Sequence, residues 1–247
     1  MKRLFLILGI MLLLFNSISF AITYDTGKIG FEEDFDKNIA FEDLIEPVLD
    51  EKGNHAKDRF TNRPLFRYNP YINEILKATK VTIDKDNNKL ITGYPNGTFK
   101  PNDNVTKAEF LKMAIGISVN RNFDFDAIPS SHIKHWAAPY VAVAEMQNVI
   151  DKGLYYEGNL NEPITRLEMI VILSKIQINM KGTPQYRDGE LPEYEDISTL
   201  SEEEKGYLLH AARYELIEGM LDSNTKEIRP FDNITRGEAA RAIIRVY

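Results

Sequence analysis

The chain has 247 residues, of which 43% are hydrophobic and 11% aromatic, so it can bury the core of one or two compact domains. Its 27% of charged residues excludes a polytopic membrane protein, and the absence of cysteine excludes a disulfide scaffold, a thiol nucleophile and a cysteine-ligated metal. A formal net charge of −7 argues against binding nucleic acid through a globally basic surface.

Residues 1–21 have the order of a secretory signal peptide. Lys2 and Arg3 precede an apolar run that reaches Phe15, and Ser19-Phe20-Ala21 supplies a small-x-small cleavage site. A retained membrane anchor is the alternative, but the apolar run is short for a span and polar residues follow it. We expect cleavage after Ala21, export, and no membrane attachment of the mature protein.

Residues 22–65 form an N-terminal acidic segment that is too small for a usual catalytic domain. The spacing of Phe41, Leu44, Ile45 and Val48 predicts a short amphipathic helix that ends near Gly53. We expect this helix to pack on the rest of the chain or to present a surface to an envelope protein partner.

The remainder of the chain contains a repeated capping signal. Thr165 follows Thr106 by 165 − 106 = 59 residues, and Thr235 follows Thr165 by 235 − 165 = 70 residues. Each threonine is followed three residues later by a glutamate, which predicts a capping box at a helix start: Thr106 with Glu109, Thr165 with Glu168, and Thr235 with Glu238. We interpret these six residues as structural.

The helices predicted after these caps share one register. Apolar residues recur at offsets of zero, three, four and seven from the fourth residue after each threonine, which is one face of an α-helix. They are Phe110, Met113, Ala114 and Ile117, then Met169, Ile172, Leu173 and Ile176, then Ala239, Ala242, Ile243 and Val246. A second helix is predicted upstream of each cap, over residues 71–77, 140–146 and 207–213. Three helix-loop-helix units are therefore expected to pack around the capped helices.

A glycine approaches the connection in each unit, at Gly93, Gly153 and Gly219. Their main predicted role is a helix C-cap in the left-handed conformation, with close ligand approach to bare backbone as a second role. The first connection, residues 93–101, has the turn chemistry of Pro-Asn-Gly.

A cation follows each capping threonine: Lys107, Arg166 and Arg236. A cation at the positive end of a helix is unfavourable by itself, so its recurrence needs an explanation. Exposed first-turn amides together with the cation make an anion site; the alternative is that each cation pairs with a nearby acid, including the capping glutamate. Trp136 likewise has two interpretations, a platform for a sugar ring or a core residue.

Motifs for catalysis and metal binding are missing. Asp84-x-Asp86-x-Asn88 begins like a calcium loop, but Lys89 and Pro95 stand where glycine and glutamate are required. The sequence has no His-Glu-x-x-His, Gly-x-Ser-x-Gly, Walker loop or dinucleotide fingerprint. We predict no catalytic residue, no metal site and no cofactor.

Residues 91–101, Ile-Thr-Gly-Tyr-Pro-Asn-Gly-Thr-Phe-Lys-Pro, followed by Val105–Phe110, closely resemble the S-layer homology (SLH) repeat, as does His135–Tyr140 in the second unit. The resemblance implies a mainly α-helical fold in which three helix-loop-helix repeats, residues 66–120, 121–182 and 183–247, form a pseudo-threefold bundle. It also implies non-covalent attachment to a peptidoglycan-linked secondary cell wall polymer, often with pyruvylated sugars, contacted by the basic residue that follows each capping threonine.

The chain departs from the SLH pattern in several places. The first unit carries an insertion at residues 84–89, and the tryptophan of the His-Trp pair occurs once, since Arg67 and Glu203 align with Trp136. Some of the three grooves are therefore expected to bind weakly or not at all.

The resulting prediction is an exported, non-catalytic cell-wall-binding module at a bacterial cell surface or S-layer. The alternatives are a small envelope enzyme acting on wall glycan or peptide, and a degenerate module for protein–protein assembly. We expect replacement of the three cations to abolish wall binding while leaving helicity and thermal unfolding nearly unchanged.

Overall fold

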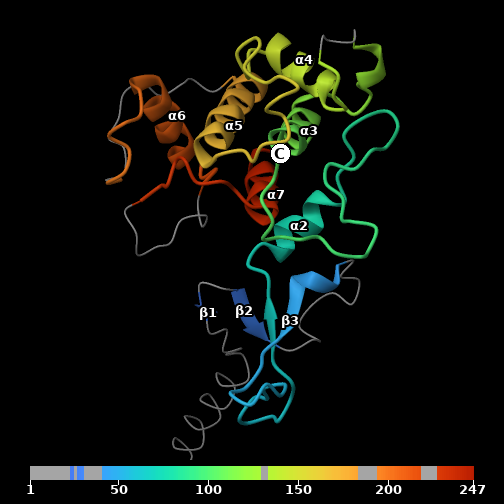
Figure 1. Cartoon of the computed structure of the whole chain (residues 1–247), viewed down its shortest axis with the longest axis vertical. Coiled ribbons are helices and arrows are strands. Elements are labelled where there is room, and N and C mark those ends of the chain that lie inside the picture. The colour runs from blue at the N-terminus through green and yellow to red at the C-terminus, as the bar shows by residue number, and fades with distance from the viewer. Residues whose placement is uncertain (1–22, 25–26, 31–40, 129–132, 183–193, 218–226) are drawn as a thin grey trace, which may run out of the picture. The chain divides into compact units, whose positions relative to one another are not determined.

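The computed structural model describes residues 23–24, 27–30, 41–128, 133–182, 194–217 and 227–247, so the predicted signal peptide lies outside the described residues. The chain divides into two compact units, residues 1–70 and 71–247 (Figure 1). The predicted start of the first repeat at residue 66 falls just before this division. Within the described ranges, no helix is long and apolar enough to span a membrane.

The N-terminal unit contains a small antiparallel sheet with strand order β1-β2-β4-β3. Its strands are β1 (Thr23–Tyr24), β2 (Gly27–Gly30), β3 (Ile45–Pro47) and β4 (Phe66–Tyr68). The helix predicted through Phe41, Leu44, Ile45 and Val48 is wrong: one 3-10 turn, η2 (Glu42–Leu44), leads directly into β3. Ile45 and Val48 are β-branched and Pro47 cannot continue a helix, so pairing with β4 prevails over the apolar spacing.

The second unit is built from six α-helices among its described residues, with one short 3-10 turn, η3 (Phe125–Ala127). The helices are α2 (Ile72–Ala78), α3 (Lys107–Ser118), α4 (Ala138–Met146), α5 (Arg166–Lys181), α6 (Glu202–Arg213) and α7 (Arg236–Val246). The capped helices α3, α5 and α7 pack on one another, and each also receives the upstream helix of another repeat: α4 on α3, α6 on α5, and α2 on α7. This cyclic arrangement confirms the mainly α-helical bundle with pseudo-threefold order.

The core of this unit is the predicted register of the three capped helices. All twelve residues of that register are buried, with exposed fractions of 4% or less. The three predicted capping boxes are also confirmed, with reciprocal threonine and glutamate bonds at each start. A fourth box, Ser201 with Glu204, starts α6 and carries the same Ser/Thr-x-x-Glu signal.

A ring of three backbone hydrogen bonds joins the segments just before the caps. Val105 donates its N–H to the carbonyl of Ile234, Ile234 donates to Ile164, and Ile164 donates to Val105, at 3.0–3.1 Å. Each of the three residues is fully buried. Because each link joins two repeats that are distant in sequence, the three helix starts are held together as one assembly.

His210 is a buried titratable group between α5 and α6. Its Nε2 lies 2.9 Å from the Gln177 amide oxygen, and its Nδ1 has no hydrogen-bond partner among the described residues. Burial lowers the pKa of His210 below 6.5, so the unfolded chain binds a proton more readily than the folded one. This contribution to stability is complete above pH 6.5 and is lost as the pH falls through 6.5 towards the folded pKa.

We therefore expect the free energy of unfolding to decrease between about pH 7 and pH 5 more steeply for the wild type than for His210→Gln, which cannot gain the proton. Urea unfolding across this range measures the difference. Equal slopes for the two proteins would show that His210 is not destabilised by protonation.

Candidate functional site

The starts of α3, α5 and α7 meet where the repeats join, and their first amides are already used. Lys107 donates its N–H to the carbonyl of Glu162 and Ala108 to that of Leu160, at 2.9 and 3.0 Å. The same pair of bonds recurs at the other two starts: Arg166 to Asp232, Leu167 to Pro230, Arg236 to Asp103 and Gly237 to Pro101. The threonine hydroxyls accept from the third residue. The predicted exposed first-turn amides are therefore wrong, and these helix starts are not free anion sites.

The three predicted cations pair with the capping glutamates of neighbouring repeats. In each glutamate Oε2 accepts from its own capping threonine, which leaves Oε1 for the cation. Arg166 Nη2 lies 2.9 Å from Glu238, Arg236 Nη1 lies 3.4 Å from Glu109, and Lys107 Nζ lies 3.7 Å from Glu168. The pairing alternative is thus present, in a cyclic form in which every repeat contacts the next.

Burial makes these ion pairs part of the fold. Arg166 and Arg236 are 3% and 6% exposed. Arg236 also donates to the carbonyls of Phe99 and Thr92 at 3.0 and 2.9 Å, whereas Arg166 Nε and Nη1 have no hydrogen-bond partner among the described residues. Removing either guanidinium leaves a carboxylate without its charge partner, so the expectation of unchanged thermal unfolding does not fit this geometry.

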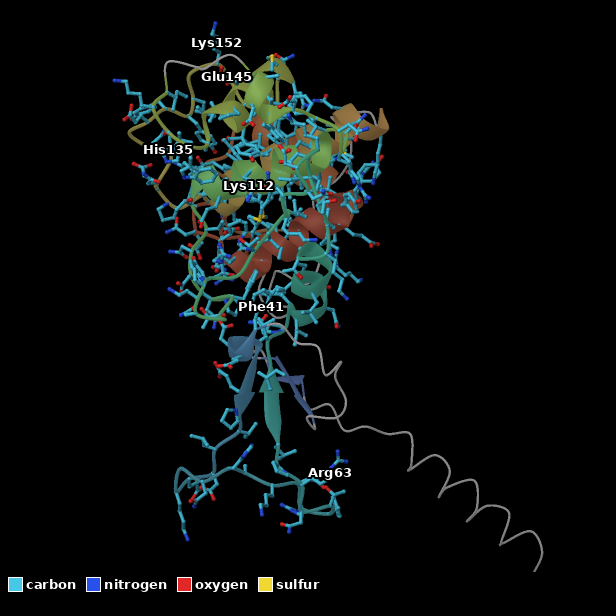
Figure 2. The ribbon with its side chains drawn as sticks, turned by 90° about the vertical axis from the view of Figure 1, so that its right-hand side faces the viewer. Phe41, Arg63, Lys112, His135, Glu145 and Lys152 are labelled. Carbon is cyan, nitrogen blue, oxygen red and sulfur yellow. The ribbon has the colours of Figure 1, made fainter. Side chains whose placement is uncertain are left out.

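A cavity of about 220 Å³, here called the first groove, lies beside the start of α3. Its lining consists of Leu90, Ile91, Thr92, Glu109, Lys112, Met113, Trp136 and Arg236. Trp136 is 53% exposed, so the interpretation as a core residue is wrong. The His135 and Tyr140 rings lie 5.4 and 6.3 Å from the indole and support it from one side. Lys112 and His135, the neighbour of Trp136, are both labelled in Figure 2.

A cavity of about 290 Å³, the second groove, occupies the equivalent place beside α5. Six residues of the first groove, moved along the chain by the 59 residues that separate the caps, give Val149, Ile150, Asp151, Glu168, Val171 and Ile172, and all six line the second groove. Glu203, which aligns with Trp136, lines it too, together with Glu204 and Lys175. The two grooves are therefore repeats of one architecture with different side chains.

The glycines predicted as helix C-caps do not have that role. The upstream helices end at Thr79, Gln147 and Tyr214. Gly153 is left-handed, with a φ of 79°, but it lies in a later turn where its N–H donates to the Glu145 carboxylate at 2.8 Å. Glu145 and the adjacent Lys152 are labelled in Figure 2. Gly93 has no positive φ, and Gly219 lies outside the described residues.

The acidic insertion of the first repeat is a turn. Asp84 is 6% exposed and accepts from the backbone of Asp86 and Asn88, at 3.0 Å each, and from the Asn88 side chain at 2.8 Å. Its carboxylate is thus occupied by local donors. Over the described ranges, no group of three potential ligands is placed to hold a metal ion.

Comparison with known proteins gives one family match. The S-layer homology domain model matches residues 87–111 and 193–240, which include Leu90, Ile91, Thr92, Glu109 and Arg236 of the first groove. An endoglucanase of Bacillus sp. strain KSM-635 is 28% identical over 158 residues, or 63% of this chain. A protein of Bacillus anthracis described as an uncharacterized cell wall amidase is 34% identical over 90 residues, or 34% of this chain. The chain covers 16% of the length of each relative.

Proposed function

The chain is an S-layer homology domain protein, and we propose that it attaches non-covalently to an anionic secondary cell wall polymer. The family match implies cell-wall anchoring at a bacterial surface. The proposed role is that of a non-catalytic anchor or adaptor, exported by the signal sequence of residues 1–21. The enzyme names of the two relatives belong to proteins of which the chain matches 16%, so they assign no activity to this chain.

The observation that carries this proposal is the composition of the first groove. A half-exposed tryptophan and two cations, Lys112 and Arg236, share one concave surface with a single carboxylate, Glu109. An indole face offers a flat apolar partner to the C–H groups of a pyranose ring, and the cations favour an acidic substituent on that sugar. A pyruvate ketal is such a substituent, because it places a carboxylate beside the ring.

The test is sedimentation of the mature chain with Bacillus sacculi, before and after acid extraction of the secondary polymer. We expect the protein to sediment with intact sacculi and to stay in the supernatant with extracted ones. Binding that survives extraction would count against polymer recognition and favour a protein or peptidoglycan partner. Release of reducing ends or peptide from the sacculi during the incubation would instead support the alternative of a small envelope enzyme.

A further inference from the structure

Lys112 is a cation of the first groove with no counter-ion. It lies on α3 between the buried residues Leu111 and Met113, is itself partly buried, and makes no ion pair or hydrogen bond with any described residue. The other cation of the groove, Arg236, is neutralised by Glu109. An ammonium that is partly removed from water and left unpaired in the wall of a cavity is placed to receive an anion from outside.

The second groove has the opposite charge. Val171 stands at the position of Lys112, and Glu203 stands at the position of Trp136. Asp151, Glu168, Glu203 and Glu204 line this groove with one cation, Lys175, whose ammonium already lies 5.5 Å from the centre of the Tyr207 ring. An acidic ligand meets like charge here and finds no indole face.

On the basis of the proposed function, we infer that the first groove carries the polymer and the second groove rejects it. Lys112 binds the carboxylate of an acidic sugar, and Trp136 stacks on the ring of that sugar. Arg236 and Glu109 form the fixed, internally paired wall of the groove and are not its main anion contact. The specificity of the module thus depends on one residue in the middle of a capped helix, outside the three cations that follow the capping threonines.

The experiment compares two lysines in equivalent grooves. Lys112→Ala is expected to weaken sedimentation with polymer-bearing sacculi at least about tenfold, because a charge-assisted hydrogen bond is lost. Lys175→Ala, in the second groove, is expected to bind within about twofold of the wild type. Circular dichroism and thermal unfolding establish that both variants are folded, and Lys112→Arg, which keeps the charge, is expected to retain most of the binding.

A small probe identifies the acidic group. Methyl glucopyranoside 4,6-pyruvate ketal is expected to compete with the sacculi for the wild type, while its neutral methyl ester is expected not to compete. Equal competition by acid and ester would overturn the assignment of a carboxylate to Lys112.

The pH profile supplies a second readout. Burial lowers the pKa of Lys112, and the charged groups near it are Asp84, whose negative charge opposes this shift, and the Glu109–Arg236 pair of the groove. Binding needs the ammonium form, so it is expected to fall on the alkaline side before ordinary lysines, with a pKa of 10.5, deprotonate. Lys112→Arg is expected to remove this loss, since arginine keeps its proton.

Two failures are distinguishable. If the wild type does not sediment with polymer-bearing sacculi, the proposed function is wrong. If the wild type sediments and Lys112→Ala binds equally well, or Lys175→Ala is the variant that loses binding, the attachment stands and the assignment to the first groove is overturned.

Discussion

Arg166→Ala is expected to lower the free energy of unfolding by about 3–5 kcal/mol. The guanidinium is 3% exposed and lies 2.9 Å from Glu238, whose side chain is 10% exposed. Removing it leaves a carboxylate in a poorly hydrated site without its charge partner, at the junction where two repeats are joined. Urea denaturation followed by circular dichroism measures the change.

Two controls separate burial from the ion pair itself. Lys205 and Glu202 form a pair of the same length, 2.9 Å, but the carboxylate is 91% exposed, so Lys205→Ala is expected to cost less than about 0.5 kcal/mol. The double variant Arg166→Met with Glu238→Gln buries no charge, and its amide still accepts from the Thr235 N–H, so it is expected to recover roughly half of the loss. A loss below about 1 kcal/mol for Arg166→Ala would show that the cyclic ion pairs do not hold the repeats together.

Tyr155→Ala is the second substitution with a large expected effect, about 3–5 kcal/mol of unfolding free energy. The ring is 1% exposed, lies 5.7 Å from the Lys107 ammonium, and donates its hydroxyl to Glu168 at 3.2 Å. Burial, with the nearby negative charge of Glu168, raises the pKa of this phenol, so it stays protonated and remains a donor at physiological pH. Tyr155→Phe removes only the hydroxyl and is expected to cost about 0.5–1.5 kcal/mol.

The neighbouring tyrosine provides a matched control in the same turn. Tyr156 is 57% exposed, and Tyr156→Ala is expected to change stability by less than about 0.5 kcal/mol. Equal effects at the two positions in urea denaturation would contradict the assignment of Tyr155 to the core.

Much of the helical unit is predictable because its signals are local. A capping box needs only Thr-x-x-Glu, and the buried face follows from apolar spacing, so both are confirmed at α3, α5 and α7. The partners of Lys107, Arg166 and Arg236 are different. Pairing with an acid can be anticipated, but the glutamate of the next repeat becomes the partner only when the three helix starts converge.

The errors have equally specific causes. Phe41, Leu44, Ile45 and Val48 fit a helical face, yet their β-branched members and Pro47 favour the strand that pairs with β4. Gly93 matches a C-cap pattern, but helix α2 ends well before it, at Thr79. Local spacing cannot decide between structures that both satisfy it.

Lys112 was the functional candidate that motif reasoning missed. The recurring cation after each threonine draws attention to the helix starts, whereas a single lysine inside an apolar helix has no equivalent in the other repeats: Val171 stands in its place in the second. Its unpaired state and its place on the groove wall are properties of the folded chain. The available signal was a lysine beside the buried register at Met113.

The fluorescence of Trp136 tests the central claim most directly, because this is the single tryptophan of the chain and it lines the first groove. Titration of the mature protein with polymer released from sacculi is expected to give a saturable change in its emission, and Lys112→Ala is expected to shift that curve to at least about tenfold higher concentration. Polymer binding that saturates without any change in the emission of Trp136 would contradict the placement of the ligand in this groove.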